Sequence, residues 1–363
     1  MPHIIAIGTY LPSWGCDAHR IAGDDEDAIT LAVEAGRAAL SEGGAVERVV
    51  LVSRDLPLLE SSNAAVLLAG LGLDPELEVD ERLGGAPATL DAVSSARSRT
   101  LVIGTDLDPA GAAAILTAES GLQVRTAARV ARSLPVRTRN ASGVLHDYGD
   151  PPMLPTSGAS AGLFALAALA ESRTNGPLVA VEQASLSGVT VVGGNAAVCR
   201  REPVARPRPQ AKITTGPEIP ISLAAYERAF EAKVRREAGR HGGSDELDFP
   251  PRYRLDEDGT LTTDCELVPL PRVGTVYTEV TVHIPVPGLR TPYSLAVVEL
   301  DDVGVRALVK VTGVEAGTVR IGDRGRLTLR RVAMRSGVPD YGYSFEPFQP
   351  APREPSPWSW GAA

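Results

Sequence analysis

The residues GTVYTEVTVHIPVPGLRTPYSLAVVEL (274–300) decide the fold of the C-terminal part of the chain. Val276–His283 and Ser294–Leu300 are rich in β-branched residues, and Pro and Gly separate them, so the pattern predicts two strands. Two further strands are expected at Ala307–Thr312 and Arg326–Val332. Several short strands with turn residues at near-regular spacing predict a small barrel or sandwich.

Upstream of these strands the chain contains a predicted helix and a predicted linker. Apolar residues from Leu223 to Val234 recur at helical spacing, and the helix is expected to end near Gly239. The stretch CRREPVARPRPQAK (199–212) combines prolines with five basic residues and shows no apolar periodicity. Proline removes backbone donors and fixes φ, so we interpret this stretch as a surface linker. A docking site for an acidic partner or for CoA phosphates is the alternative.

The first part of the chain alternates strands and helices, which predicts an α/β sheet covered on its faces. The expected strands are Ile4–Thr9, Val49–Val52, Leu77–Val79, Leu101–Gly104, Leu178–Glu182 and Val189–Val192. The expected helices are Glu26–Leu40, Asn63–Leu71, Ala86–Ala96 and Ser157–Glu171. We therefore expect an α/β domain (1–198), a Pro/Arg-rich linker (199–219), a helix with a β-barrel (220–347) and a disordered tail (348–363).

Composition excludes several classes of protein. The net charge of −9 argues against nucleic acid as a partner, because phosphate binding requires a basic surface. The chain has three cysteines, Cys16, Cys199 and Cys265, with no close pair, which favours a reducing cytoplasm. The longest apolar runs, such as Leu163–Ala170, are shorter than the roughly 20 residues of a membrane span. The opening MPHIIAIGTYLP has no basic leader, so no signal peptide is expected.

Four segments of the first half resemble the thiolase superfamily, in particular hydroxymethylglutaryl-CoA synthase and ketoacyl synthase III. IIAIGTYLP (4–12) is similar to the opening strand of that family, and DEDAITLAVEAGRAAL (25–40) to its first helix. GAAAILTAESG (111–121) is similar to a later strand, and PTSGASAGLFALAALAE (155–171) to the closing helix. The resemblance covers roughly residues 2 to 193 and implies a truncated thiolase-like α/β domain, because the second half of that fold has little room here.

The family's nucleophilic cysteine corresponds to the segment ERLGGAPATLDAV (81–93). In that family the cysteine precedes a buried helix, whose N-terminus favours the reactive thiolate. Matching Gly84 and Gly85 to the family's two glycines puts Arg82 at the cysteine position. A guanidinium cannot lose its proton and cannot accept an acyl group. The resemblance also puts Thr156 where the family has an asparagine, so covalent catalysis is not expected.

The second half resembles the OB-fold domain that accompanies acyl-CoA thiolases. The resemblance covers about 220 to 347 and rests on residues 274–300, on IGDRGRLTL (321–329) and on DFPPRY (248–253). A zinc ribbon precedes the OB-fold in that family, but this region offers only Cys265 and His241. Structural zinc requires four ligands, so no zinc is expected, nor any other tightly bound cofactor.

The two resemblances together imply a noncatalytic subunit of a heteromeric thiolase-type complex, associated with acyl-CoA. A thiolase-superfamily partner would perform carbon–carbon bond formation, acyl transfer or retro-aldol cleavage, and the chain would form a homo- or hetero-oligomer. One alternative is a stand-alone acyltransferase or lyase that uses acid–base chemistry. Its candidate residues are His146 and Asp106, with Asp147, Tyr148 and Asp150. Another alternative is a scaffold or acyl-CoA-binding protein without an enzyme partner.

A CoA thioester, if it binds, needs cations for its phosphates. The candidates are Arg82, Arg290 in the PGLRTPY loop (287–293), and Arg252, which we interpret as a surface residue. Tyr293 ends the same loop and is expected at the mouth of the barrel. The sequence does not define the acyl chain or the pathway.

Overall fold

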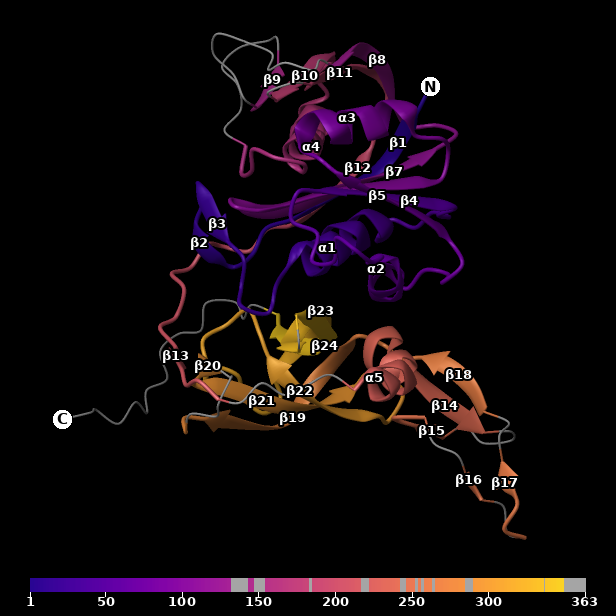
Figure 1. Ribbon diagram of the computed structural model, residues 1–363, viewed down its shortest axis with the longest axis vertical. Helices are drawn as coiled ribbons and strands as arrows, with labels where there is room; N and C mark the ends of the chain where they lie inside the picture. Colours follow the sequence, from indigo (N-terminus) through magenta and orange to yellow (C-terminus); the bar gives the residue numbers. More distant parts are fainter. Residues whose placement is uncertain are drawn as a thin grey trace, which may run out of the picture. The chain divides into compact units, whose positions relative to one another are not determined.

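The computed structural model describes residues 1–131, 143–146, 154–182, 185–216, 222–241, 246–251, 254–255, 258–262, 265–284, 290–335 and 337–348. The chain divides into two compact units (Figure 1). Unit 1 contains Met1–Gln210, Pro217–Glu237 and Leu329–Tyr343, and unit 2 contains Ala211–Gly216, Ala238–Thr328 and Ser344–Ala363.

Unit 1 is an α/β unit, as the sequence predicts. Its strands are β1 (His3–Tyr10), β2 (Trp14–Cys16), β3 (His19–Ile21), β4 (Arg48–Ser53), β5 (Glu78–Leu83), β6 (Thr100–Leu107), β7 (Ala110–Ala118), β8 (Leu122–Ala131), β9 (Gly143–His146), β10 (Gly176–Glu182), β11 (Ser185–Gly193) and β12 (Ala197–Arg201). Its helices are α1 (Ala28–Leu40), α2 (Ala64–Leu71), α3 (Ala86–Ser95), α4 (Ala161–Ser172), α5 (Leu223–Phe230) and the π-helix η1 (Glu231–Arg235).

A ten-stranded sheet organises unit 1, in the order β5-β4-β6-β7-β1-β8-β11-β10-β9, with β12 beside β1. Helices α1 and α2 lie on one side of strands β1, β4, β5 and β7 (Figure 1). Helices α3 and α4 lie on the other side, with β8, β10 and β11 beyond them (Figure 1). An apolar core packs α3 and α4 between the strands on their two sides, and it includes Val52, Leu90, Phe164 and Val189.

Local sequence explains why the helices form where they do. Asp27 caps α1, because its carboxylate accepts hydrogen bonds from the backbone N–H groups of Ile29 (3.1 Å) and Thr30 (3.0 Å). Helix α4 is apolar on all sides and is buried along most of its length, as expected for a helix between two layers of sheet. Gly8 lets β1 approach α1, since a Cβ there would lie 2.2 Å from the backbone nitrogen of Ala39.

The predicted linker is partly structured. The expectation that 199–212 contains no strand is wrong at its start, because Cys199–Arg201 belongs to β12, which pairs in parallel with β1. The chain that follows also bonds to unit 1: the Arg206 N–H donates to the Ser13 carbonyl (2.9 Å), and Arg20 donates to the Pro203 carbonyl (2.8 Å). Proline prevents a continuous ladder here but leaves single hydrogen bonds between the prolines.

Unit 2 contains a closed five-stranded barrel, in the order β19-β21-β22-β24-β23. Its strands are β19 (Val273–Val282), β21 (Tyr293–Leu300), β22 (Arg306–Val311), β23 (Arg324–Arg335) and β24 (Val338–Pro347). Smaller pieces are β13 (Lys212–Ile213), β14 (Glu237–His241), β15 (Leu247–Asp248), β16 (Arg254–Leu255), β17 (Leu261–Thr262), β18 (Cys265–Pro269) and β20 (Arg290–Thr291). The predicted barrel strands are confirmed, and β24, which the sequence did not predict, closes the barrel.

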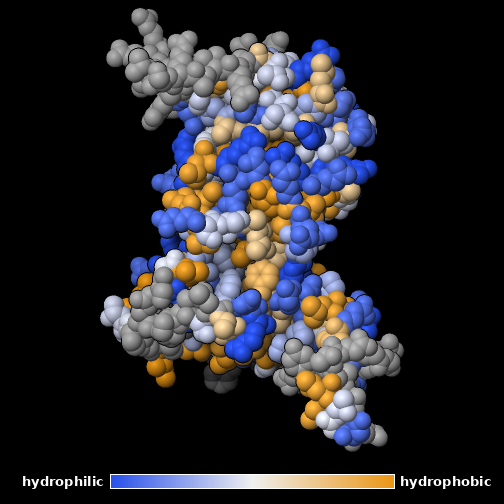
Figure 2. Space-filling view, turned by 45° about the vertical axis from the view of Figure 1, so that its right-hand side comes forward, coloured by the Kyte–Doolittle hydropathy of each residue, from blue (hydrophilic) through white to orange (hydrophobic). Residues whose placement is uncertain are grey.

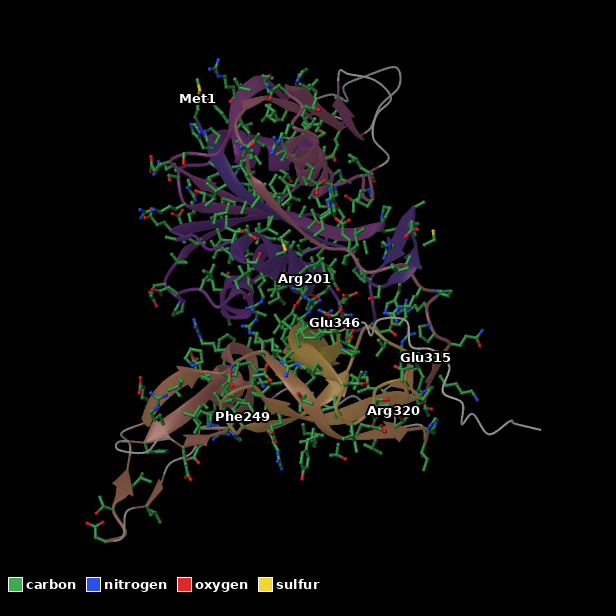
Figure 3. All side chains as sticks on the ribbon, turned by 180° about the vertical axis from the view of Figure 1, so that it is seen from behind. Met1, Arg201, Phe249, Glu315, Arg320 and Glu346 are labelled. Atoms are coloured by element: carbon green, nitrogen blue, oxygen red, sulfur yellow. The ribbon has the colours of Figure 1, made fainter. Side chains whose placement is uncertain are left out.

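The strands β23 and β24 are shared between the units, since Leu329–Tyr343 belongs to unit 1. There the buried Arg330 guanidinium donates to the Tyr10 hydroxyl (3.2 Å) and lies 3.3 Å from a Glu26 carboxylate oxygen. Glu34 lies 3.9 Å from Arg330 and also pairs with Arg201, which is labelled in Figure 3. Burial raises the pKa of Glu26, and the charge of Arg330 offsets part of that rise. Buried charges require such pairing, because each one has lost its hydration.

Among the described residues, no helix is both long enough and apolar enough to span a membrane.

Candidate functional site

The candidate site of unit 1 lies where helices α3 and α4 begin. Gly85 is the N-cap of α3, and the first turn of that helix reads Ala-Pro-Ala (86–88), with Pro in its usual place near the start. The N-cap of α4 is Ser160. Helix N-termini carry unpaired N–H groups and a partial positive charge, so both positions favour an anion.

A carboxylate from β10 occupies the N-terminus of α3. Glu182, the last residue of β10, accepts a hydrogen bond from the Ala86 N–H (3.1 Å) and an ion-pair contact from Arg54 (2.5 Å). Gly85 makes room for this pair, because a Cβ there would lie 2.0 Å from a Glu182 oxygen and 2.4 Å from an Arg54 nitrogen. Glu182 is 17% exposed and Arg54 is 54% exposed, so the pair borders solvent. The N-terminus of α3, a position that would favour a thiolate, therefore holds the carboxylate of Glu182 from the same chain.

A second carboxylate, Asp106 of β6, occupies the N-terminus of α4. It accepts hydrogen bonds from the N–H groups of Ala159 (2.7 Å) and Ser160 (2.8 Å) and from the Ser160 hydroxyl (2.6 Å). The Ser160 hydroxyl is also 2.8 Å from that of Thr156. Burial raises the pKa of Asp106, while these hydrogen bonds and the charge of Arg54 lower it in part. Asp106 thus holds Ala159 and Ser160, the two residues that lead into α4.

The predicted nucleophile position, Arg82, lies in β5 and not at a helix start. Its guanidinium bonds the Asp80 carboxylate (2.6 and 2.9 Å) and lies 3.9 Å from Asp91 of α3. The preceding residue, Glu81, points the other way and accepts a hydrogen bond from the Asn63 N–H (2.8 Å) at the start of α2. Alternate residues of β5 therefore fix the two helices on opposite faces of the sheet, which is a structural role for Arg82.

Of the acid–base candidates His146 and Asp106, the structure brings only Asp106 to this place. The backbone of His146 pairs with Leu178 in β10, four residues before Glu182, a separation of roughly 13 Å along a strand. Asp147, Tyr148, Asp150 and Arg252 lie outside the described residues.

The predicted CoA-binding residues are divided between the two units. Arg82 belongs to unit 1, whereas Arg290 and Tyr293 belong to unit 2. Arg290 lies in β20, paired with Ile213, and Tyr293 begins β21 with the Lys310 nitrogen 5.5 Å from its ring centre. No CoA site assembles from these three residues within one unit.

Arg54 and Glu182 were missed by the sequence reasoning. Arg54 directly follows one predicted strand and Glu182 ends another. A charged residue at the end of a buried strand is a signal that could have drawn attention to them. Their contact with α3 is set by tertiary structure, since Glu182 is 96 residues from Ala86.

The segment before the barrel contains His241 and Cys265, the two residues weighed above as zinc ligands. His241 of β14 is buried and lies 3.4 Å from an Asp248 carboxylate oxygen. Across the part of the chain that the structure describes, no three His, Cys, Asp or Glu residues are grouped to hold a metal ion.

The protein therefore has an α/β unit and a closed C-terminal β-barrel. In the α/β unit, the carboxylates of Glu182 and Asp106 bind backbone N–H groups at the start of α3 and just before α4. The sequence model of the ChsH2 C-terminal OB-fold domain matches residues 267–330, which contain β19, β21, β22 and the start of β23 of the barrel. The predicted fold class, an α/β domain followed by an OB-fold barrel, is thereby confirmed. No curated protein matches the chain in sequence.

Solved structures similar to the chain include enzymes of the thiolase type. FabH from Pseudomonas aeruginosa, a 3-oxoacyl-(acyl carrier protein) synthase III, is 16% identical with a TM-score of 0.40, covering 57% of this chain and 99% of its own. PksG, an HMG-CoA synthase from Bacillus subtilis, is 16% identical with a TM-score of 0.33, covering 39% of this chain and 48% of its own. This chain thus matches about half the length of PksG.

A further similar structure is described as the Ltp2-ChsH2(DUF35) aldolase. It is 24% identical with a TM-score of 0.28, covering 36% of this chain and 98% of its own.

Proposed function

We propose that this chain is a noncatalytic, acyl-CoA-associated subunit of a heteromeric thiolase-type complex. The observation that carries the proposal is the Glu182 carboxylate at the N-terminus of α3, held by Ala86 and Arg54. Thiolase-type chemistry needs a thiolate at such a place, and a carboxylate already fills it. The first turn of α3 supplies only Ala and Pro side chains in its place.

The OB-fold barrel supports a role beside a partner enzyme. The matched domain is the C-terminal domain of ChsH2, a name that also occurs in the aldolase named above. A thiolase-type partner would perform carbon–carbon bond formation, acyl transfer or retro-aldol cleavage on an acyl-CoA. Acid–base catalysis by this chain alone finds no support in Asp106, because its carboxylate is engaged by three hydrogen bonds from Ala159 and Ser160, just before α4.

The test is co-expression with a thiolase-superfamily protein encoded next to this chain, followed by size-exclusion chromatography and acyl-CoA turnover assays. We expect one complex that elutes together, turnover by the complex, and none by this chain alone. Turnover by the isolated chain, or separate elution of the two proteins, would contradict the proposal. The Glu182→Gln variant should leave turnover by the complex within a few-fold of the wild type, as expected for a residue outside the chemistry.

A further inference from the structure

A small sheet of unit 2 gathers a thiol, an imidazole and a carboxylate on one face. Its strands follow the order β15-β14-β18. Asp248 of β15 pairs with Gly239 of β14, and a Cβ added to Gly239 would lie 2.6 Å from the sulfur of Cys265 in β18. His241 stands two residues after Gly239 in the same strand. Residues two apart in a strand, and residues paired across strands, share a face. We call Cys265, His241 and Asp248, which surround the space that Gly239 leaves open, the thiol cluster.

His241 is a buried side chain without a hydrogen bond. It is 5% exposed, and neither of its ring nitrogens has a hydrogen-bond partner within the described residues. Its Nε2 lies 3.4 Å from an Asp248 carboxylate oxygen, so the ring leans toward the strand position opposite Gly239. A buried polar group left without a partner is costly, and such a group often marks a redox or catalytic role. The imidazole is therefore available to take a proton from a thiol on its own face.

The other charged side chains beside the thiol cluster face away from it. Arg240 and Glu266 form an ion pair (3.5 Å) and are 44% and 68% exposed. Each directly adjoins a member of the thiol cluster in its strand, and successive side chains of a strand alternate in face, so this pair lies on the opposite face. On the face of His241, Glu237 begins β14 roughly 13 Å away along the strand, and Asp248 is the charge beside the ring. A carboxylate there favours the protonated imidazole and orients it.

Solvent reaches this end of unit 2. Between Asp248 and Cys265 the chain forms the hairpin β16–β17, whose apolar residues come to the surface at the lower right of Figure 2 (orange). Leu255 and Leu261 of that hairpin are 70% and 53% exposed. Cys265 itself is partly exposed at the start of β18. Partial exposure sets Cys265 apart from a buried structural cysteine, which is inert, and gives a small molecule access to this residue.

We propose that Cys265 is a reactive thiol that His241 deprotonates, and that it forms a mixed disulfide with low-molecular-weight disulfides. The Cys265 sulfur attacks one sulfur of the disulfide R–S–S–R as its proton passes to the imidazole. The bond between the Cys265 sulfur and one R–S group forms, the S–S bond of the reagent breaks, and the leaving R–S⁻ takes up the proton. The thiol is oxidised and the reagent is reduced, so no further oxidant is required. This reversible modification does not depend on the proposed function.

The test exposes the full chain to glutathione disulfide and follows each cysteine by mass spectrometry of its peptide. Cys265 should react at least about 5-fold faster at about pH 7 than Cys16, the exposed thiol, which exposure alone would put first. His241→Gln should slow Cys265 roughly 10-fold at about pH 7 and less than about 2-fold near pH 9.5, where a thiol ionises unaided. The rates at Cys16 and Cys199 should not change. Arg240→Gln, on the other face of the same strand, is the matched control and should leave all three rates unchanged.

Two results would overturn the proposal directly: Cys265 reacting no faster than Cys16, or an unchanged Cys265 rate in His241→Gln. A loss of the same size at both pH values would also contradict it, because the ring would then shape the site without moving a proton. Thermal unfolding shows whether His241→Gln folds. If it does not, Asp248→Asn takes its place and should slow Cys265 roughly 3-fold at about pH 7, and an unchanged rate there would again overturn the proposal.

Discussion

At the scale of single residues, Glu182 and Asp106 show that carboxylates of the chain itself can occupy the anion-binding positions where helices begin. Asp106 is buried under three hydrogen bonds, whereas Glu182 balances Arg54 at the border of solvent. The sequence pointed to Asp106 as an acid–base candidate from its residue type alone. It could not reveal that the donors are Ala159 and Ser160, just before α4, because these lie more than fifty residues away.

The first prediction concerns the Glu182–Arg54 pair. Glu182→Gln should destabilise the protein by about 1 kcal/mol, because the helix start loses a charged acceptor and half-exposed Arg54 limits the effect. The matched control is Glu47→Gln, which breaks a 2.5 Å pair with Arg99 in a more exposed setting and should cost less than about 0.5 kcal/mol. Urea unfolding of both variants measures the difference. Equal costs for the two variants would show that α3 gains nothing from Glu182.

The second prediction concerns the pH dependence that Glu26 contributes. Burial raises its pKa in the folded protein, so the folded state binds the proton more tightly than the unfolded state does. The resulting stabilisation is complete below the unfolded pKa of about 4.3 and is lost as the pH rises through the folded pKa. Glu26→Gln removes it, so the wild type should gain stability relative to this variant as the pH falls through the folded pKa toward the unfolded one. Urea unfolding of both proteins at a series of pH values tests the slope.

At the scale of elements, the sequence predicted those segments whose apolar pattern is unbroken. α4 and β21 belong to this group, and burial on both sides of α4 follows from its all-round apolar surface. β24 was missed because Pro339, Gly342 and Pro347 interrupt a strand whose Tyr341, Tyr343 and Phe345 are nonetheless buried. Likewise β12 was hidden by the charges of Arg200 and Arg201, which pair with Glu171 and Glu34. Turn and charge patterns are local, and tertiary pairing overrides them.

The third prediction tests the buried arginine of β23. Arg330→Met should destabilise the protein by about 3–5 kcal/mol, because Glu26 and Glu34 lose a buried partner. The control is Arg324→Met. Arg324 lies on the same strand as Arg330, is exposed and pairs with Asp301, so its loss should cost less than about 1 kcal/mol. The double variant Arg330→Met with Glu26→Gln should recover part of the loss, since one buried charge is no longer left alone. Strict additivity of the two changes in unfolding free energy would rule out the coupling.

At the scale of the whole molecule, unit 1 is discontinuous, since Leu329–Tyr343 completes a unit that the N-terminal residues begin. The Tyr341 hydroxyl donates to the Asp27 carboxylate that caps α1 (2.8 Å), and the Arg331 N–H donates to the Asp25 carbonyl (2.8 Å). The sequence placed a boundary between the domains near residue 199 and could not show that the chain returns to unit 1 after the barrel. Such a return depends on long-range contacts that leave no local pattern.

The fourth prediction concerns metal content. Since the described residues near His241 and Cys265 hold no set of metal ligands, the purified full chain should contain far less than one equivalent of zinc. Dialysis against EDTA should leave its Tm unchanged, because no folding energy comes from a metal. Elemental analysis together with the melting curve measures both. Stoichiometric zinc whose removal lowers the Tm would overturn the expectation.

The last prediction follows from the discontinuous unit. Residues that stabilise one cooperative unit open together, so backbone amides of α1 and of Leu329–Tyr343 should exchange with similar opening free energies. Arg330→Met should lower protection in both segments by comparable amounts, because its guanidinium links Tyr10, Glu26 and Glu34 to β23. Amides of β19 and β21, which belong to unit 2, should keep their protection. Hydrogen exchange read by mass spectrometry follows all four segments in one experiment. Equal loss of protection in β19 and β21 would mean that the chain opens as one cooperative body, and the buried arginine would then stabilise the whole protein instead of one unit.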